Sequence, residues 1–388
     1  MAPRSKLHLA VALDGAGWHP AAWRDPLARP GELFTAAYWV DLVQEAERGL
    51  LDFVTFEDSL GPQSSRPDGP DQRTDQVRGR LDAGVLAARV APHTERIGLV
   101  PTAVVTHTEP FHISKAVASL DYVSSGRAGW QPQVASRHDV AAHFGRRDVP
   151  ADPTELFAEA ADYVEVVRRL WDSWEDDAEI RDVATGRFID RDKLHYIDFT
   201  GKWFSVKGPS ITPRPPQGQP LVAALATDAV EHRFAARAAD VVFTTPHDVE
   251  QARLIVERLR AEQLDAGRGE EFLHIFADLV VFLDDTAAAD RKARLDELDG
   301  AEHSSDARVF TGTPAQLADL LLDWAAAGLT GFRLRPAALP RDLTAITRRL
   351  VPELHRRGAL RTGYEATTLR GLLGLPRPAN RYAVGGVR

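Results

Sequence analysis

The stretch that decides the fold runs from residue 95 to residue 130 and reads ERIGLVPTAVVTHTEPFHISKAVASLDYVSSGRAGW. It contains an apolar run at 97–105, a helical pattern at 113–123 and a second apolar run that begins at 128. A strand, a helix and a strand in this order form a unit whose strands are parallel and joined by a right-handed crossover. The sequence therefore predicts an α/β fold.

The same alternation repeats along the chain. Strands are predicted at 7–13, 53–56, 97–105, 128–135, 221–226, 241–244, 273–283 and 331–335. Helical patterns follow these strands, with examples at 39–48, 155–174, 249–262, 286–298, 314–327 and 343–357. About eight such units favour a (β/α)₈ TIM barrel with insertions. The alternative is an open doubly wound sheet, which is less favoured because no GxGxxG motif follows the first strand.

The 388 residues are expected to form one domain, 1–388, because no linker rich in glycine, serine or proline divides them. Proline-rich residues 176–220 interrupt the alternation and are expected to form an insertion of short hairpins and loops. Residues 359–388 are expected to form a C-terminal tail. Residues 59–80 and 299–312 have the composition of surface loops.

Composition excludes several classes of protein. The chain has no cysteine, so disulfides, zinc–thiolate sites and cysteine nucleophiles are ruled out. A net charge of −9 without a basic stripe argues against a nucleic-acid partner. No stretch approaches the 18 apolar residues of a membrane span, and the N-terminal apolar run is too short for a signal peptide. A cytoplasmic location is expected, since the lack of disulfides is compatible with a reducing compartment.

In a barrel, functional groups lie at the C-terminal ends of the strands. Glu57 and Asp58 follow the second strand, either as an acid/base pair or as a loop carboxylate beside a helix cap. Arg333 and Arg335 end the last strand, where they can meet an anionic substrate or form a solvated pair on the rim. Four histidines, at 107, 112, 138 and 143, have spacings that do not suit a metal site, so no metal is expected.

Several longer segments carry a family resemblance, among them GWHPAAWRDP at 17–26, the stretch 95–130 with its Gly-Arg-x-Gly-Trp turn, and GKWFSVKGPSITPRPPQGQP at 201–220. From these, and from collinear similarity between about residues 6 and 382, the chain resembles the bacterial-luciferase-like flavin-dependent monooxygenases. The branch that it resembles contains the nitrilotriacetate and dibenzothiophene-sulfone monooxygenases.

The resemblance implies a barrel that binds reduced FMN (FMNH₂), supplied by a separate flavin reductase, at its C-terminal mouth. It implies that O₂ adds to the flavin as a C4a-hydroperoxide, which oxygenates a small organic substrate. Water must be excluded from such a site, so loops 59–80 and 299–312 are candidate lids. A homodimer or homotetramer is also implied.

Site residues follow from the matched positions. Asp58 matches the flavin-contacting aspartate of the family, Thr102 and Thr106 lie in the strand that meets the flavin ring, and Gln131 stands where the branch usually has asparagine. Flavin contacts are expected from Asp58, Thr102, Thr106, Gln131, Ser136, Phe157, Thr227 and Asp228. Catalytic roles are expected for His107, Trp130 and Arg335.

The phosphate end departs from the family pattern. Pro153 and Phe157 replace a histidine and a tyrosine, and Ala226, Thr227 and Asp228 replace a Gly-Ser-Ser turn. Asp228 would repel a phosphate by roughly 3 kcal/mol per like-charge pair at about 5 Å and an effective dielectric near 20. It can instead cap the helix that follows it.

Cations elsewhere can compensate for this change, and the candidates are Arg137, Arg146, Arg147 and His232. The alternative function is a flavin-poor, non-catalytic paralogue or a partner subunit of a luciferase-like complex. If Asp228 faces the phosphate, Asp228→Ser is expected to tighten FMN binding.

Overall fold

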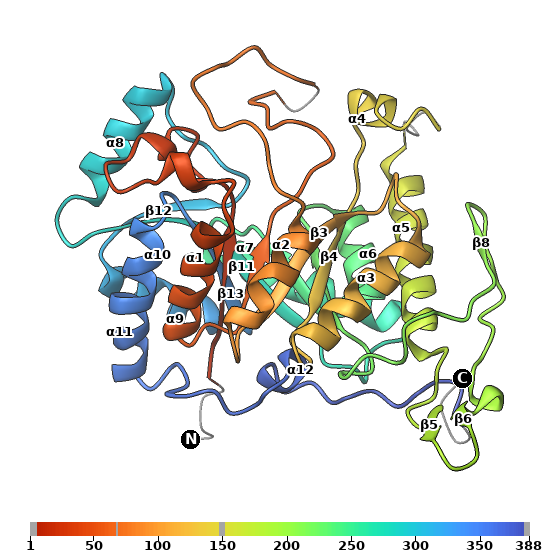
Figure 1. Ribbon diagram of the computed structural model, residues 1–388. Coiled ribbons are helices and arrows are strands. Elements are labelled where there is room, and N and C mark those ends of the chain that lie inside the picture. Colours follow the sequence, from red (N-terminus) through yellow and green to blue (C-terminus); the bar gives the residue numbers. More distant parts are fainter. Residues whose placement is uncertain (1–5, 67–68, 147–151, 384–388) are drawn as a thin grey trace.

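Eight parallel strands close into a barrel in the computed structural model, which describes residues 6–66, 69–146 and 152–383 (Figure 1). Strand β13 pairs with both β1 and β11, and β10 pairs with both β9 and β11, so that the barrel has no open edge. The strands are β1 (His8–Leu13), β2 (Phe53–Phe56), β3 (Gly98–Val104), β4 (Gly129–Gln133), β9 (Leu221–Leu225), β10 (Val241–Thr244), β11 (His274–Leu283) and β13 (Gly331–Pro336). The predicted (β/α)₈ barrel is confirmed.

Helices surround the barrel and bury their apolar stripes against its outer face. They are α1 (Ala36–Arg48), α2 (Ala83–Val90), α3 (Pro110–Val123), α5 (Pro153–Asp172), α6 (Ala229–Ala238), α7 (Val249–Asp265), α8 (Ala288–Asp299), α9 (Pro314–Ala325), and α10 (Arg341–Ala345) continuing through a π-helical turn into α11 (Val351–Arg356). Thr313 caps the start of α9 in a capping box, in which Gln316 completes the reciprocal pair of hydrogen bonds. Asp82, Asp152, Asp228 and Asp248 cap α2, α5, α6 and α7.

The two expected loops differ in outcome. The described residues of 59–80 form no helix or strand and rise above the barrel as a long loop (Figure 1). The expectation of a loop over 299–312 is wrong at its end, because β12 (Arg308–Gly312) pairs in parallel with residues 279–283 of β11. Strand β11 is ten residues long, so its last residues extend beyond β10 and leave backbone groups that β12 satisfies.

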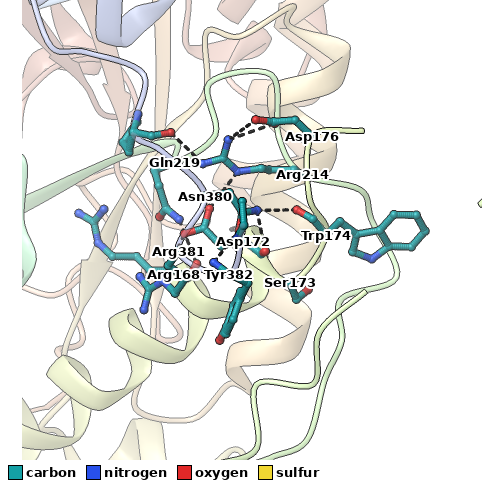
Figure 2. A network of polar contacts seen from close by, with 12 residues as sticks. Arg168, Asp172, Ser173, Trp174, Asp176, Arg214, Gln219, Asn380, Arg381 and Tyr382 are labelled. Carbon is teal, nitrogen blue, oxygen red and sulfur yellow. Dashed lines mark hydrogen bonds and ion pairs between the residues drawn. The ribbon is translucent and has the colours of Figure 1, made fainter. Parts of the chain in front are cut away.

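The range 176–220 contains two short hairpins, β5 (Glu179–Asp182) with β6 (Arg187–Ile189) and β7 (Phe199–Thr200) with β8 (Ser205–Val206). Figure 2 shows how this range is tied to the tail and to the end of α5. Arg214 donates hydrogen bonds to the carboxylates of Asp172 and Asp176 and to the carbonyl oxygen of Pro378. Asn380 donates to two backbone carbonyls at the end of α5.

The tail also closes the bottom of the barrel. Helix α12 (Leu369–Leu372) lies under the N-terminal ends of the strands (Figure 1), and Leu369 and Leu373 pack against the interior residues Phe53 and Phe276. The mouth at the opposite end is therefore the end that a ligand can enter.

Within the described ranges, no helix is long and apolar enough to cross a membrane.

His274 makes stability dependent on pH. Its Nε2 lies 2.8 Å from the carbonyl oxygen of Leu373 in the tail, and burial, followed by the nearby His8, lowers its pKa to about 4. A lowered pKa means that the unfolded chain binds the proton more readily, so stability falls as the pH decreases from about 6.5 toward 4.

We expect His274→Gln, which keeps a side-chain donor but cannot ionise, to reduce the loss of unfolding free energy between pH 7 and pH 4.5 by about 2 kcal/mol. Urea unfolding at both pH values measures this loss. His112→Gln, at an exposed position, is the control. An equal loss in the His274 variant and the unmodified protein would contradict the assignment.

Candidate active site

A buried ionic network fills the barrel below its mouth. Asp278, from the middle of β11, is fully buried and accepts hydrogen bonds from two arginines of β13. Arg333 donates to both of its oxygens, at 2.9 and 2.5 Å, and Arg335 donates two bonds to Oδ2 at 2.9 and 2.5 Å. Charge-assisted pairs of this geometry are among the strongest polar contacts in proteins.

Arg333 and Arg335 do not form the solvated rim pair that the sequence suggests, because their side chains are 1% and 2% exposed. Side chains alternate along a strand, so both point to the same side of β13 as Gly331, into the barrel. The Arg333 guanidinium lies 3.8 Å from the ring centre of Phe243, and that of Arg335 lies 4.5 Å from Trp18. The expected catalytic role of Arg335 stays a prediction, and its guanidinium is held by carboxylates.

A second tier of polar groups surrounds these arginines. Arg333 also donates to Gln131, at 2.9 Å, and its Nη1 lies 3.5 Å from Glu57. Arg335 donates to Asp306 at 2.6 and 3.1 Å, which ties the segment between α8 and β12 to the barrel interior. Gln131, an expected flavin contact, is thus a partner of Arg333.

Glu57 and Asp58 face different neighbours, as adjacent residues at a strand end should. Burial raises the pKa of the Glu57 carboxyl, and the opposing effect of Arg333 is smaller. The Asp58 carboxylate accepts hydrogen bonds from the backbone N–H groups of Ser59 and Ala83, at 2.7 and 2.9 Å, although burial still raises its pKa. Glu57 is therefore a carboxylate at the mouth, and Asp58 is a carboxylate that binds the start of α2. The two do not form a catalytic acid/base pair.

Three expected site residues line one cavity of about 440 Å³ beside α2 and α3, namely Asp58, Thr102 and Trp130. Thr102 is 2% exposed, and its Oγ1 is buried with no hydrogen-bond partner among the described residues. Asp58 and Thr102 are the positions at which the resemblance places contacts to a flavin ring. A buried hydroxyl with unused bonding capacity at such a position fits a polar ligand.

Trp130 lies on the helix-facing side of the barrel wall. It is fully buried, pairs in register with Val222, and its ring centre lies 6.3 Å from that of Tyr163 on α5. Its neighbour Gly129 pairs with Leu221, which faces the interior. The expected catalytic role of Trp130 stays a prediction, since this placement turns its ring away from the barrel interior.

The remaining ring-side candidates lie in the segments after β3 and β4. Thr106 Oγ1 accepts a hydrogen bond from the backbone N–H of Ala135 at 2.8 Å, which joins the two segments. The half-buried ring of His107 stacks on Phe144, with ring centres 5.1 Å apart. Ser136 is exposed.

The phosphate-side candidates lie at the start of α6 and on α5. Asp228 accepts from the backbone N–H groups of Val230 and Glu231, so its predicted capping role is confirmed. Thr227 is bonded to the Glu231 carboxylate, and the half-buried ring of Phe157 packs on Phe234, with ring centres 5.6 Å apart. Of the ring-side residues, Asp58 and Thr102 therefore fit a polar ligand such as a flavin, whereas the phosphate-side residues present carboxylates and an apolar ring.

Sequence reasoning missed Asp278, the centre of the ionic network. A signal was present, because a single carboxylate interrupts the apolar run of 275–283 and two arginines alternate on the last strand. A carboxylate in a buried strand requires a buried cation. The cation that pairs with Asp278 depends on which strands lie next to each other. Neither segment alone predicts that strand pairing.

A closed parallel barrel with polar groups at the C-terminal ends of its strands is typical of TIM-barrel enzymes. The family model described as luciferase-like monooxygenase matches residues 17–328. The chain belongs to the luciferase-like monooxygenase family, and the resemblance is confirmed.

Two curated relatives match over nearly their full length. The N-acetyl-S-(2-succino)cysteine monooxygenase of Bacillus subtilis is 32% identical over 98% of this chain and 99% of its own. Nitrilotriacetate monooxygenase component A of Aminobacter aminovorans is 30% identical, covering 99% of both chains. Among solved structures, a riboflavin lyase with modified FMN and riboflavin superposes with a TM-score of 0.85 at 25% identity, covering 97% of each chain.

We expect Asp278→Asn to lower the free energy of unfolding by about 3–5 kcal/mol, because it leaves two buried guanidinium groups sharing a neutral amide. Asp306→Asn is the matched control and should cost about 1 kcal/mol or less, since the Asp306 side chain is 45% exposed and Arg335 keeps Asp278. Denaturant unfolding at pH 7 measures both. Equal losses would show that Asp278 is not the centre of the network.

Proposed function

We propose that this chain is the oxygenating component of a two-component monooxygenase, which uses reduced FMN and O₂ to insert one oxygen atom into a small organic substrate. The observation that carries the proposal is that Asp58 and Thr102 line one cavity in a barrel whose family is luciferase-like monooxygenase. The name of the nitrilotriacetate relative, component A, supports a separate protein as the source of reduced flavin.

When bound, the reduced flavin supplies the electrons and activates the oxygen. The protein's part is to bind and orient the flavin and to keep water away. Asp58 offers carboxylate oxygens beside the start of α2, and Thr102 offers a hydroxyl group. Burial raises the pKa of the Glu57 carboxyl at the mouth, while the positive charge of Arg333, 3.5 Å away, opposes this shift.

The candidate lid 59–80 is bonded to the end of α8, where the second candidate lid, 299–312, begins. Arg73 Nη2, in loop 59–80, donates to the backbone carbonyl of Asp299 at 2.7 Å, and Gln76 donates to the Asp299 carboxylate at 2.8 Å. Trp23 donates to the carbonyl oxygen of Asp75, which adds the segment after β1. These bonds hold loop 59–80 in place, which suits a reaction that must exclude water.

The assembly is proposed by analogy with the family. We propose a homodimer or homotetramer, a transient complex with a flavin reductase, and a cytoplasmic location. Neither a nucleic acid nor a membrane is proposed as a partner.

The alternative function, a non-catalytic partner subunit, is favoured by the carboxylates at the start of α6.

The deciding experiment combines the protein with reduced FMN from a separate reductase under ¹⁸O₂ and screens small organic substrates. A product that contains one ¹⁸O atom supports the proposal. Tight anaerobic binding of reduced FMN without any oxygenated product across substrate classes would favour a partner subunit.

We expect Thr102→Val to weaken binding of reduced flavin by about fivefold, the equivalent of one neutral hydrogen bond of about 1 kcal/mol. Protein unfolding should change little, because Thr102 Oγ1 has no partner among the described residues. Anaerobic titration measures the dissociation constant, with Thr185→Val in the β5–β6 turn as the control. An unchanged dissociation constant would remove Thr102 from the flavin site.

A further inference from the structure

We propose that the flavin site of this chain does not recognise the terminal phosphate, so that riboflavin binds about as tightly as FMN. The inference rests on the proposed function, since it presupposes a flavin. It concerns the residues around the start of α6, where the backbone N–H groups of a helix would otherwise form an anion-binding site.

The first observation is that Asp228 uses these N–H groups. Its Oδ1 accepts from Val230 N at 2.8 Å and from Glu231 N at 2.9 Å. An aspartate at this position satisfies the unpaired donors of the first turn and places a full negative charge on the helix axis. A phosphate would have to displace this carboxylate before it could bind the same groups.

The second observation is that Glu231 uses the next donors. Its Oε2 accepts from the backbone N–H of Thr227 at 2.6 Å and from Thr227 Oγ1 at 2.8 Å. Among the ion pairs of the described residues, none involves Asp228 or Glu231. Two carboxylates with no ion-pair partner among the described residues therefore stand where a phosphate would need donors.

The third observation is that the start of α5 offers no substitute. Pro153 has no N–H group, Asp152 caps the helix by accepting from Thr154 N at 2.8 Å, and Lys202 is paired with Glu155 at 2.7 Å. The half-buried Phe157, one turn further on, packs on Phe234 and has no polar atom in its side chain.

The cations that could compensate for the two carboxylates are either paired with other carboxylates or uncharged. Arg137 donates two bonds to Asp139, and Arg146 is paired with Glu109 at 2.8 Å. Burial, followed by the nearby Arg258, lowers the pKa of His232, so the ring is neutral near pH 7. Arg147 lies outside the described residues.

The contacts around the start of α6 distinguish a neutral ligand group from an anionic one. A neutral terminal hydroxyl of a ribityl chain can donate a hydrogen bond to Asp228 or Glu231, whereas a phosphate dianion is repelled by both. Affinity for the flavin must then come from contacts to the ring, in which riboflavin and FMN are identical. The site is accordingly one for the flavin ring and ribityl chain, with the phosphate left unrecognised.

The test is a comparison of dissociation constants for riboflavin and FMN with the intact protein, from flavin fluorescence and then from anaerobic titration of the reduced forms. We expect the two constants to agree within about threefold. Asp228→Asn keeps a capping oxygen, so the helix start is preserved. Combined with Glu231→Gln, it should tighten FMN binding by about tenfold, while riboflavin binding stays within about threefold.

Asp190→Asn, which alters a cap in the 176–220 range, is the matched control and should change neither constant. FMN binding at least tenfold more tightly than riboflavin to the unmodified protein would overturn the inference while leaving the proposed flavin site intact. A double variant with unchanged FMN affinity would overturn the assigned role of Asp228 and Glu231. Failure of the unmodified protein and of the double variant to bind either flavin would overturn the proposed function, and this inference with it.

Discussion

The structure depends on one buried carboxylate that is shared between two guanidinium groups. Asp278 alone cannot neutralise Arg333 and Arg335, so further negative charge must come from outside the barrel core. Glu57 lies beside Arg333, and Asp306 comes from the segment between α8 and β12. Electroneutrality inside the barrel thus dictates where a surface segment lies, and it links the centre of the fold to the cover of the mouth.

Local patterning was enough to predict the architecture, because each barrel strand is an apolar run followed by a helical stripe. Local patterning did not predict β12. This strand forms because it pairs with the end of β11, which lies earlier in the sequence. The same limit applies to the site. The cap formed by Asp228 is local and was predicted, whereas the burial of Arg335 follows from its opposition to Asp278 across two strands. Site roles drawn from the family resemblance, such as that of His107, stay predictions.

The two ends of the candidate flavin site follow different physical rules. At the ring end, Asp58 and Thr102 line a largely apolar cavity, and the buried Thr102 hydroxyl has no hydrogen-bond partner among the described residues. At the other end, the backbone N–H groups of Thr227, Val230 and Glu231 are already bonded to carboxylates of the chain itself. Membership of a family therefore indicates the barrel and the class of chemistry, while the side chains at one helix start decide whether the phosphate of the cofactor is recognised.

Asp299, the last residue of α8, is bonded to both Arg73 and Gln76, so loop 59–80 is tied to the end of a helix that is distant in sequence. The loop cannot swing away from α8 without breaking these bonds. Any opening of this loop therefore begins at the end of α8. Where such an opening is slower than the chemical step, it limits turnover however reactive the bound molecules are.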